Sequence, residues 1–218
     1  MTTGTLQGQL DQIVEHFKAV APESVRSVIF KATDDFAASF DPKSTIQVGD
    51  TLPAFSLTDA VGKQVRSADL LAKGRGIVVT FYRGEWCPFC NLALAALQKR
   101  LADFEARGVT LVAVTPELPT SALSTVEKNE LKFAVLSDVG NKYAAELGIV
   151  WVQPDSLREP FAKFGHDLEK RNGDDSFAVP IPATLLVNSS GKVRNTFIDP
   201  DYKKRVEPSQ VLEWIDAL

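Results

Sequence analysis

The sequence is poor in residues that bind metals or form structural disulfides. Its 218 residues include only two cysteines, two histidines and one methionine. Two cysteines exclude the disulfide framework of a small secreted domain. With two histidines they also leave too few ligands for a zinc site within one chain, although two subunits could still share a zinc between their cysteines. We therefore expect no metal and no cofactor.

The chain also lacks a strong charge excess and a long apolar run. Its net charge is −4 with no basic stripe, which argues against a nucleic-acid partner. Its apolar runs are too short to cross a bilayer, and its N-terminus has neither the basic nor the apolar region of a signal peptide. These absences predict a cytoplasmic protein with no membrane or nucleic-acid partner.

Both cysteines lie in one decapeptide, F-Y-R-G-E-W-C-P-F-C, which spans residues 81–90. It follows an apolar run typical of a strand and precedes an apolar stripe of helical spacing. Two thiols one turn apart can close into a disulfide, and a helix N-terminus stabilises a thiolate. The spacing predicts a dithiol–disulfide cycle in which Cys87 attacks, with a lowered pKa, and the more buried Cys90 resolves. The alternative is a pair of buried, inert cysteines.

The first 43 residues are predicted to form a helical extension. Apolar residues recur at helical spacing from residue 5 to residue 40, with a break at Ala21-Pro22 that divides the segment into a hairpin. We expect this hairpin to pack on the main domain, residues 44–218, or on a second subunit. A homodimer therefore stays open.

The rest of the chain alternates between strand and helix patterns. Strands are predicted at 77–82, 109–114 and 133–136, helices at 88–107, 121–131 and 141–147, a hairpin at 184–187 and 193–197, and a closing helix at 208–218. This order predicts an α/β protein with a central mixed sheet and helices on both faces. The polar segment 149–179 has no role that its sequence assigns.

Five segments carry a resemblance to known proteins. They lie at 48–57, 81–90, 114–117, 180–187 and 199–208. Over residues 46–218 the chain resembles thioredoxin-fold proteins, and more closely the peroxiredoxin-like branch of the alkyl hydroperoxide reductase/thiol-specific antioxidant (AhpC/TSA) family. The resemblance implies a thioredoxin-like fold, redox-active cysteines and an external reductant of the thioredoxin or glutathione type.

The resemblance also implies roles for two residues near the cysteines. Pro182 stands where thioredoxin-fold proteins have a cis-proline before the strand that faces the cysteine pair, so a cis bond is expected there, with an ordinary trans proline as the alternative. Trp86 stands where a tryptophan covers the active-site face in thioredoxins. From its position alone, Arg83 is expected to assist ionisation of Cys87, and Glu85 to oppose it if it points the same way.

Departures from the resembling families are equally informative. Peroxiredoxins have a threonine at the position of Gly84, a proline at that of Thr80, and an arginine near that of Pro182. The donors that activate peroxide in that family are therefore missing from their usual places. Thioredoxins have a buried acid at the position of Phe81.

Another group must therefore take the proton from Cys90. Glu117, at the end of a predicted parallel strand, is our first candidate and Asp199 the second, since ligands gather at that sheet edge. Tyr82, Tyr202 and Arg205 are further candidates to line a pocket above the sulfurs.

For four residues the more ordinary interpretation is favoured. Glu117 and Asp199 are expected to be solvated loop acids. Arg205 is expected to be a surface residue before the last helix, and His166 a solvated surface histidine.

Three functions remain open at this point. The first is a thiol–disulfide oxidoreductase that acts on a protein disulfide. The second is a thiol-dependent peroxidase, with Cys87 peroxidatic and Cys90 resolving through a sulfenic acid. The third is a non-enzymatic binding module of the thioredoxin fold, whose cysteines have lost their role.

Overall fold

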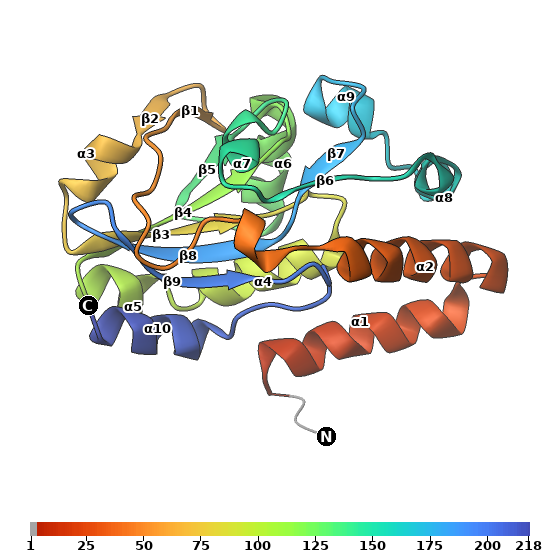
Figure 1. Cartoon of the computed structure of the whole chain (residues 1–218), viewed down its shortest axis with the longest axis horizontal. Coiled ribbons are helices and arrows are strands. Elements are labelled where there is room, and N and C mark those ends of the chain that lie inside the picture. Colours follow the sequence, from red (N-terminus) through yellow and green to blue (C-terminus); the bar gives the residue numbers. More distant parts are fainter. Residues whose placement is uncertain (1–3) are drawn as a thin grey trace.

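A seven-stranded mixed sheet forms the centre of the protein (Figure 1). The computed structural model describes residues 4–218, so the first three residues of the predicted extension lie outside it. The strand order is β2-β1-β5-β4-β3-β8-β9. The strands are β1 (Ser56–Asp59), β2 (Gln64–Arg66), β3 (Gly76–Phe81), β4 (Val109–Thr115), β5 (Ala134–Ser137), β8 (Ala183–Asn188) and β9 (Val193–Ile198).

Strand β3 lies near the middle of the sheet and leads into the cysteine motif. It pairs with β4 in parallel and with β8 antiparallel, so both of its edges are covered. Its residues are buried on both faces: Val79 and Phe81 belong to one hydrophobic core, while Val78 belongs to the other. This alternation follows from the two-residue period of a strand. The motif therefore begins at the end of a strand that is fixed from all sides.

Helices cover both faces of the sheet, as the sequence predicts. One core takes side chains from α1 (Leu6–Val20), α4 (Pro88–Gln98), α5 (Leu101–Ala106), α6 (Pro119–Lys128) and α10 (Pro208–Asp216). The other takes side chains from α2 (Glu23–Ser39), α3 (Ser67–Leu71), α7 (Lys142–Glu146), α8 (Arg158–Lys163) and α9 (Leu168–Asn172). This arrangement is the expected thioredoxin-like α/β fold with N-terminal helices. Among the described residues, no helix is long and apolar enough to cross a membrane.

The N-terminal hairpin packs on its own chain. The carboxylate of Glu207, just before α10, accepts the free backbone N–H groups of Leu6 and Gln7 at 3.0 and 2.9 Å. An anion at this place satisfies the first donors of α1 and favours its dipole. Buried Leu6 and Leu10 then place α1 in the same core as α4. The domain boundary at residue 43 and the homodimer stay predictions.

Two segments differ from the predicted elements. The helix expected at 88–107 is divided into α4 and α5, because Arg100 leaves the helical conformation between them. The segment 149–179, which the sequence left without a role, is ordered. It forms β6 (Val150–Val152), η2 (Asp155–Leu157), α8, α9 and β7 (Ala178–Pro180), and β6 and β7 pair as a separate two-stranded sheet.

Candidate active site

The two cysteines lie at the N-terminus of α4, where the sequence places them. Cys87 is the N-cap, Pro88 is the first helical residue, and the Cys87 sulfur accepts the backbone N–H of Cys90 at 3.4 Å. The two sulfurs are 2.7 Å apart and both belong to free, buried thiols. Cys87 is only 1% exposed and Cys90 is fully buried. The pair is thus a close dithiol that can form a disulfide with little movement.

The hydrogen bond from Cys87 and two guanidinium groups favour ionisation of Cys90. The Nη2 group of Arg205 donates to the sulfur of Cys90 at 3.4 Å, and the charge of Arg83 acts on both sulfurs. Burial opposes ionisation of Cys90, but the hydrogen bond from Cys87 and the charge of Arg205 lower the pKa of Cys90 to about 6. Burial and its bond to Cys90 raise the pKa of Cys87 well above its usual value. The predicted lowering at Cys87 is therefore wrong, because the acidity belongs to a pair that shares one proton.

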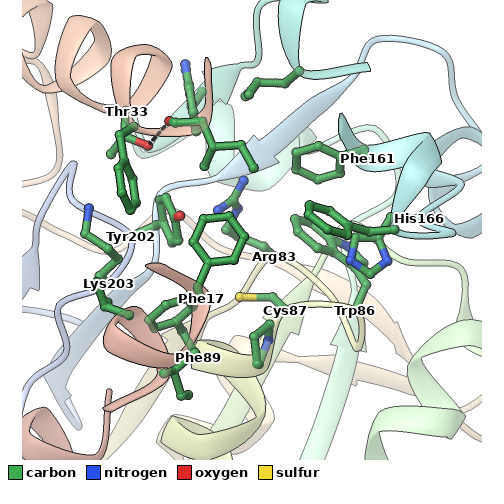
Figure 2. A pocket seen from close by; sticks show the side chains of 18 residues that line it. Phe17, Thr33, Arg83, Trp86, Cys87, Phe89, Phe161, His166, Tyr202 and Lys203 are labelled. Atoms are coloured by element: carbon green, nitrogen blue, oxygen red, sulfur yellow. Dashed lines mark hydrogen bonds between the residues drawn. The ribbon is translucent and has the colours of Figure 1, made fainter. Parts of the chain in front are cut away.

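Access distinguishes the two sulfurs. Cys87 lines a pocket of about 440 Å³, whereas Cys90 does not (Figure 2). The pocket walls come from widely separated parts of the chain. They are formed by the N-terminal helices (Ile13, Val14, Phe17, Ile29, Phe30, Thr33), the cysteine motif (Arg83, Trp86, Cys87, Pro88, Phe89), the segment 151–166 (Trp151, Leu157, Phe161, Phe164, His166), and Tyr202 with Lys203. A molecule in this cavity, which we call the Cys87 pocket, meets Cys87 first.

Arg83 is held at the wall of the Cys87 pocket by acceptors that carry no charge. It is 3% exposed, and its Nη2 group donates to Oε1 of Gln153 at 2.6 Å. Its guanidinium carbon lies 4.6, 4.9 and 5.6 Å from the ring centres of Tyr202, Trp86 and Trp151. Aromatic faces stabilise a desolvated cation. The expected assistance of Arg83 to the thiolate thus has a structural basis.

The two acidic residues of the site point away from the sulfurs. Glu85 pairs with Lys128 and, at 3.2 Å, with Arg171, so it does not oppose the thiolate. Glu117 is fully buried at the end of β4 and accepts the backbone N–H of Glu85 at 3.0 Å and the guanidinium of Arg171 at 3.3 Å. Burial raises the pKa of Glu117 to about 7. Its hydrogen bonds hold the loop in front of Cys87.

Asp199, the second candidate for the proton acceptor, also binds elsewhere. Its carboxylate accepts the backbone N–H of Asp201 at 2.9 Å and pairs with Lys204 at 3.4 Å. The structure therefore gives neither acid a direct bond to Cys90.

Comparison with known proteins gives the family. Residues 48–196 match the family model described as the AhpC/TSA family. The chain belongs to the AhpC/TSA family. One relative is the thiol-disulfide oxidoreductase ResA of Bacillus anthracis, which is 25% identical over 77% of this chain and 79% of that protein. Another is the peroxiredoxin Bcp of Escherichia coli, which is 24% identical over 78% of this chain and 96% of that protein.

Solved structures confirm the fold. The peroxidoxin BcpB of Mycobacterium tuberculosis superposes with a TM-score of 0.61 at 19% identity, over 79% of this chain and 98% of that one. The relatives carry the names of two kinds of oxidoreductase, and both act through thiols. This AhpC/TSA protein is therefore a thiol-based oxidoreductase, and the names leave disulfide exchange and peroxide reduction equally open.

The AhpC/TSA threonine that precedes the reactive cysteine has no room here. Gly84 has a φ of +150°, which favours glycine. A β-carbon there would lie 2.4 Å from Nε1 of Trp86 and 2.9 Å from Oε1 of Glu117. The cationic groups that act on the sulfurs come from other places: Arg83 follows β3 and Arg205 precedes α10.

The cis bond expected at Pro182 is not present. The structure has no cis peptide bond in residues 4–218. The reason is the path of the chain: the N–H of Ile181 donates to the carbonyl of Ile149 at 2.8 Å, which extends the β6–β7 ladder up to Pro182. The chain enters β8 in an extended form, where the ordinary preference of about 0.5–1 kcal/mol for trans X–Pro holds. Pro182 is therefore not the cis-proline of an exchange site.

Three other residues lie elsewhere than expected. Arg205 bonds to Cys90 instead of facing solvent, and His166 lines the Cys87 pocket beside Trp86, with ring centres 5.4 Å apart. Tyr202 lines the pocket as proposed, but Tyr82 is buried beneath it in the core with the cysteines. The sequence showed no signal for His166, because the segment around it has no clear periodicity.

The buried carboxyl of Glu117 gives a testable pH dependence. Its pKa of about 7 is above the unfolded value of 4.5, so the folded protein loses stability as pH rises through this range. Glu117→Gln should match the wild type at pH 4, below the unfolded pKa, and be more stable by about 1–3 kcal/mol at pH 8. Urea unfolding of the reduced proteins at both pH values measures this, with the exposed Glu105→Gln as control. Equal stability at pH 8 would contradict a buried charge at Glu117.

Proposed function

We propose that this protein is a thiol-dependent peroxidase that reduces hydroperoxides of small molecules. The observation that carries the proposal is the position of Cys87. Its sulfur shares a proton with Cys90 beside two guanidinium groups, and it faces a small-molecule pocket. A thiolate with cationic donors around it can attack a peroxide oxygen and stabilise the charge of the leaving oxygen.

The reaction has two steps. The proton shared by the two sulfurs first moves from Cys87 to Cys90, which leaves Cys87 as the thiolate. Cys87 then attacks the terminal oxygen of the hydroperoxide, so an S–O bond forms, the O–O bond breaks, and the leaving alkoxide takes the proton from Cys90 to become an alcohol. Cys90 then attacks the sulfur of the resulting sulfenic acid, forming the disulfide and releasing water. Overall, the dithiol loses two electrons and two protons, and the hydroperoxide becomes one alcohol and one water. An external reductant of the thioredoxin or glutathione type restores both thiols with its own two electrons and protons.

Thiol–disulfide exchange is the second candidate, and the name of the ResA relative favours it. A protein disulfide must reach the sulfur of Cys87, which is 1% exposed beneath the N-terminal helices. The cis-proline that would keep a backbone edge beside the sulfur is also missing. Both features support a small substrate.

We place the protein in the cytoplasm as part of the same proposal, since a reducing compartment keeps the dithiol ready to react.

Stopped-flow fluorescence tests the proposal directly. Trp86 adjoins Cys87, so oxidation of the reduced protein should change its emission. We expect hydrogen peroxide or tert-butyl hydroperoxide to react with the reduced protein about 10³-fold faster than with a free thiol. The Cys87→Ser variant should give no fluorescence change. Rates near those of a free thiol with both peroxides, together with rapid oxidation by a protein disulfide, would instead establish the exchange reaction.

A further inference from the structure

The N-terminal hairpin supplies one side of the Cys87 pocket. Residues 48–196 match the family, so α1 and α2 lie outside the matched region. Yet Phe17 from α1 and Phe30 from α2 both line the pocket, with their ring centres 5.9 Å apart. Figure 2 shows Phe17 and Cys87 among the side chains that line the same pocket. This part of the site therefore comes from a segment that the family match does not include.

The opposite side comes from the segment 149–179. The ring of Phe164 lies 6.2 Å from that of Phe17, so the hairpin and the end of α8 meet across the pocket. Phe161 continues this wall and packs edge-on against Trp86 at 5.0 Å. The aromatic wall thus runs from the hairpin to the cysteine motif.

The polar groups of the pocket are few and mostly engaged. The hydroxyl of Thr33 donates to the carbonyl of Ile29, and Lys203 pairs with Asp201 at 2.6 Å. Arg83 carries a buried Nε group without a hydrogen-bond partner, and it lies at the end of the pocket occupied by Cys87. Tyr202 and His166, which lies beside Trp86, are the other polar side chains of the lining. The pocket therefore has a polar end at the reactive sulfur and a mainly apolar body.

The size of the pocket also indicates its ligand. A volume of about 440 Å³ is within the range of about 300–1,000 Å³ found for sites of organic ligands. Hydrogen peroxide would fill only a small part of it. A molecule with a bulky apolar body and a hydroperoxide at one end fits both the aromatic wall and the polar end.

We propose that the α1–α2 hairpin selects the substrate, through Phe17 and Phe30, in favour of hydroperoxides with a bulky apolar body. This proposal rests on the proposed peroxidase function and adds its specificity. The hydroperoxide end lies at Cys87 beside Arg83, while the body lies against the hairpin. Burying that body holds the O–O bond against the sulfur, so the rate depends on side chains that never touch the reacting atoms.

The test compares a hydroperoxide that has a bulky apolar body with hydrogen peroxide, which has none. Reduction of cumene hydroperoxide and of hydrogen peroxide is measured as kcat/KM for wild type, Phe17→Ala and Phe30→Ala. We expect the wild type to prefer cumene hydroperoxide, and each variant to lower that preference about tenfold, as for lost apolar contacts in a binding pocket. Phe40→Ala is the control, because Phe40 packs on Phe36 at the other end of α2, and it should leave the preference unchanged. A wild type that reduces both equally, or variants with the wild-type preference, would overturn the proposal.

A binding measurement separates this proposal from the peroxidase function. The probe is 2-phenylpropan-2-ol, the alcohol that cumene hydroperoxide leaves, added to the Cys87→Ser protein, which cannot react. Trp86 and Trp151 line the pocket, so binding should change their emission in a saturable way, and adding Phe17→Ala should weaken it about tenfold. If neither hydroperoxide reacts faster with the protein than with a free thiol, the proposed peroxidase function is wrong. The binding measurement then decides by itself whether the hairpin recognises an apolar body. Absence of saturable binding would refute recognition of an apolar body.

Discussion

Cys90→Ser should reduce one equivalent of hydroperoxide per chain and then stop, whereas Cys87→Ser should reduce none above the rate without protein. The two sulfurs are only 2.7 Å apart, but Cys87 alone lines the pocket. Attack therefore belongs to Cys87, and Cys90 is needed only to remove the sulfenic acid. Loss of the nucleophile should lower kcat/KM by at least about 10³-fold.

Mass spectrometry distinguishes the two variants. After one equivalent of hydroperoxide, Cys90→Ser should carry a sulfenic acid on Cys87 that a dimedone reagent traps, and the wild type should carry an intramolecular disulfide instead. If Cys87→Ser were oxidised at Cys90 at the wild-type rate, the assignment of the attacking thiol would be reversed. If the double variant kept the full activity of the wild type, the protein would be a binding module whose cysteines have lost their role.

The sequence predicted the features that depend on neighbouring residues. The helical spacing of apolar residues gave the N-terminal hairpin, and strand–helix alternation gave the mixed sheet with helices on both faces. The Cys-x-x-Cys spacing with Pro88 gave a helix N-terminus at Cys87, and the structure has the N-cap there. In these cases short-range periodicity and capping decide the local structure, so a single sequence is sufficient.

The Cys87 pocket could not be predicted, because its walls meet only in the folded chain. Phe17, in the hairpin, and Phe161, in α8, are far apart in the sequence. Nothing in the residues around either one marks it as part of a site. The sequence also led to the wrong cysteine for the lowered pKa, because the responsible arginine is far from the cysteines in the sequence. Arg205 follows Cys90 by 115 residues, and only the fold brings its guanidinium to 3.4 Å from the sulfur. Burial, which raises the pKa of Cys87, is likewise a property of the whole structure.

Arg83→Met should raise the first pKa of the dithiol and slow peroxide reduction about 10–100-fold at pH 7. Arg83 is almost fully buried, and no ion pair between it and a carboxylate occurs within residues 4–218. A buried cation without a counterion is costly. The thiolate of the cysteine pair is the anion that its charge stabilises, since that charge lowers the pKa of both sulfurs. Methionine keeps the apolar contacts with the rings and removes only the charge and its donors.

The dependence on pH shows whether this role is electrostatic. In the wild type the pKa of about 6 at Cys90 is below the unfolded value of 9.0, so the thiolate stabilises the reduced protein above pH 9, and this stabilisation is lost as pH falls through 6. Arg83→Met should move the midpoint of iodoacetamide alkylation up by about one pH unit or more, and its peroxidase rate should recover at high pH. Arg107→Met, at a surface pair with Asp216, should leave the midpoint unchanged.

Stability of the oxidised protein separates this role from a structural one. The disulfide has no thiolate, so in that form Arg83 is a buried charge without its anion. Removing such a charge while keeping its packing is neutral or stabilising. Urea unfolding of the oxidised Arg83→Met protein should therefore show equal or greater stability than the wild type. A large loss of stability with an unchanged alkylation midpoint would mean that Arg83 supports the fold of the loop and does not activate the dithiol.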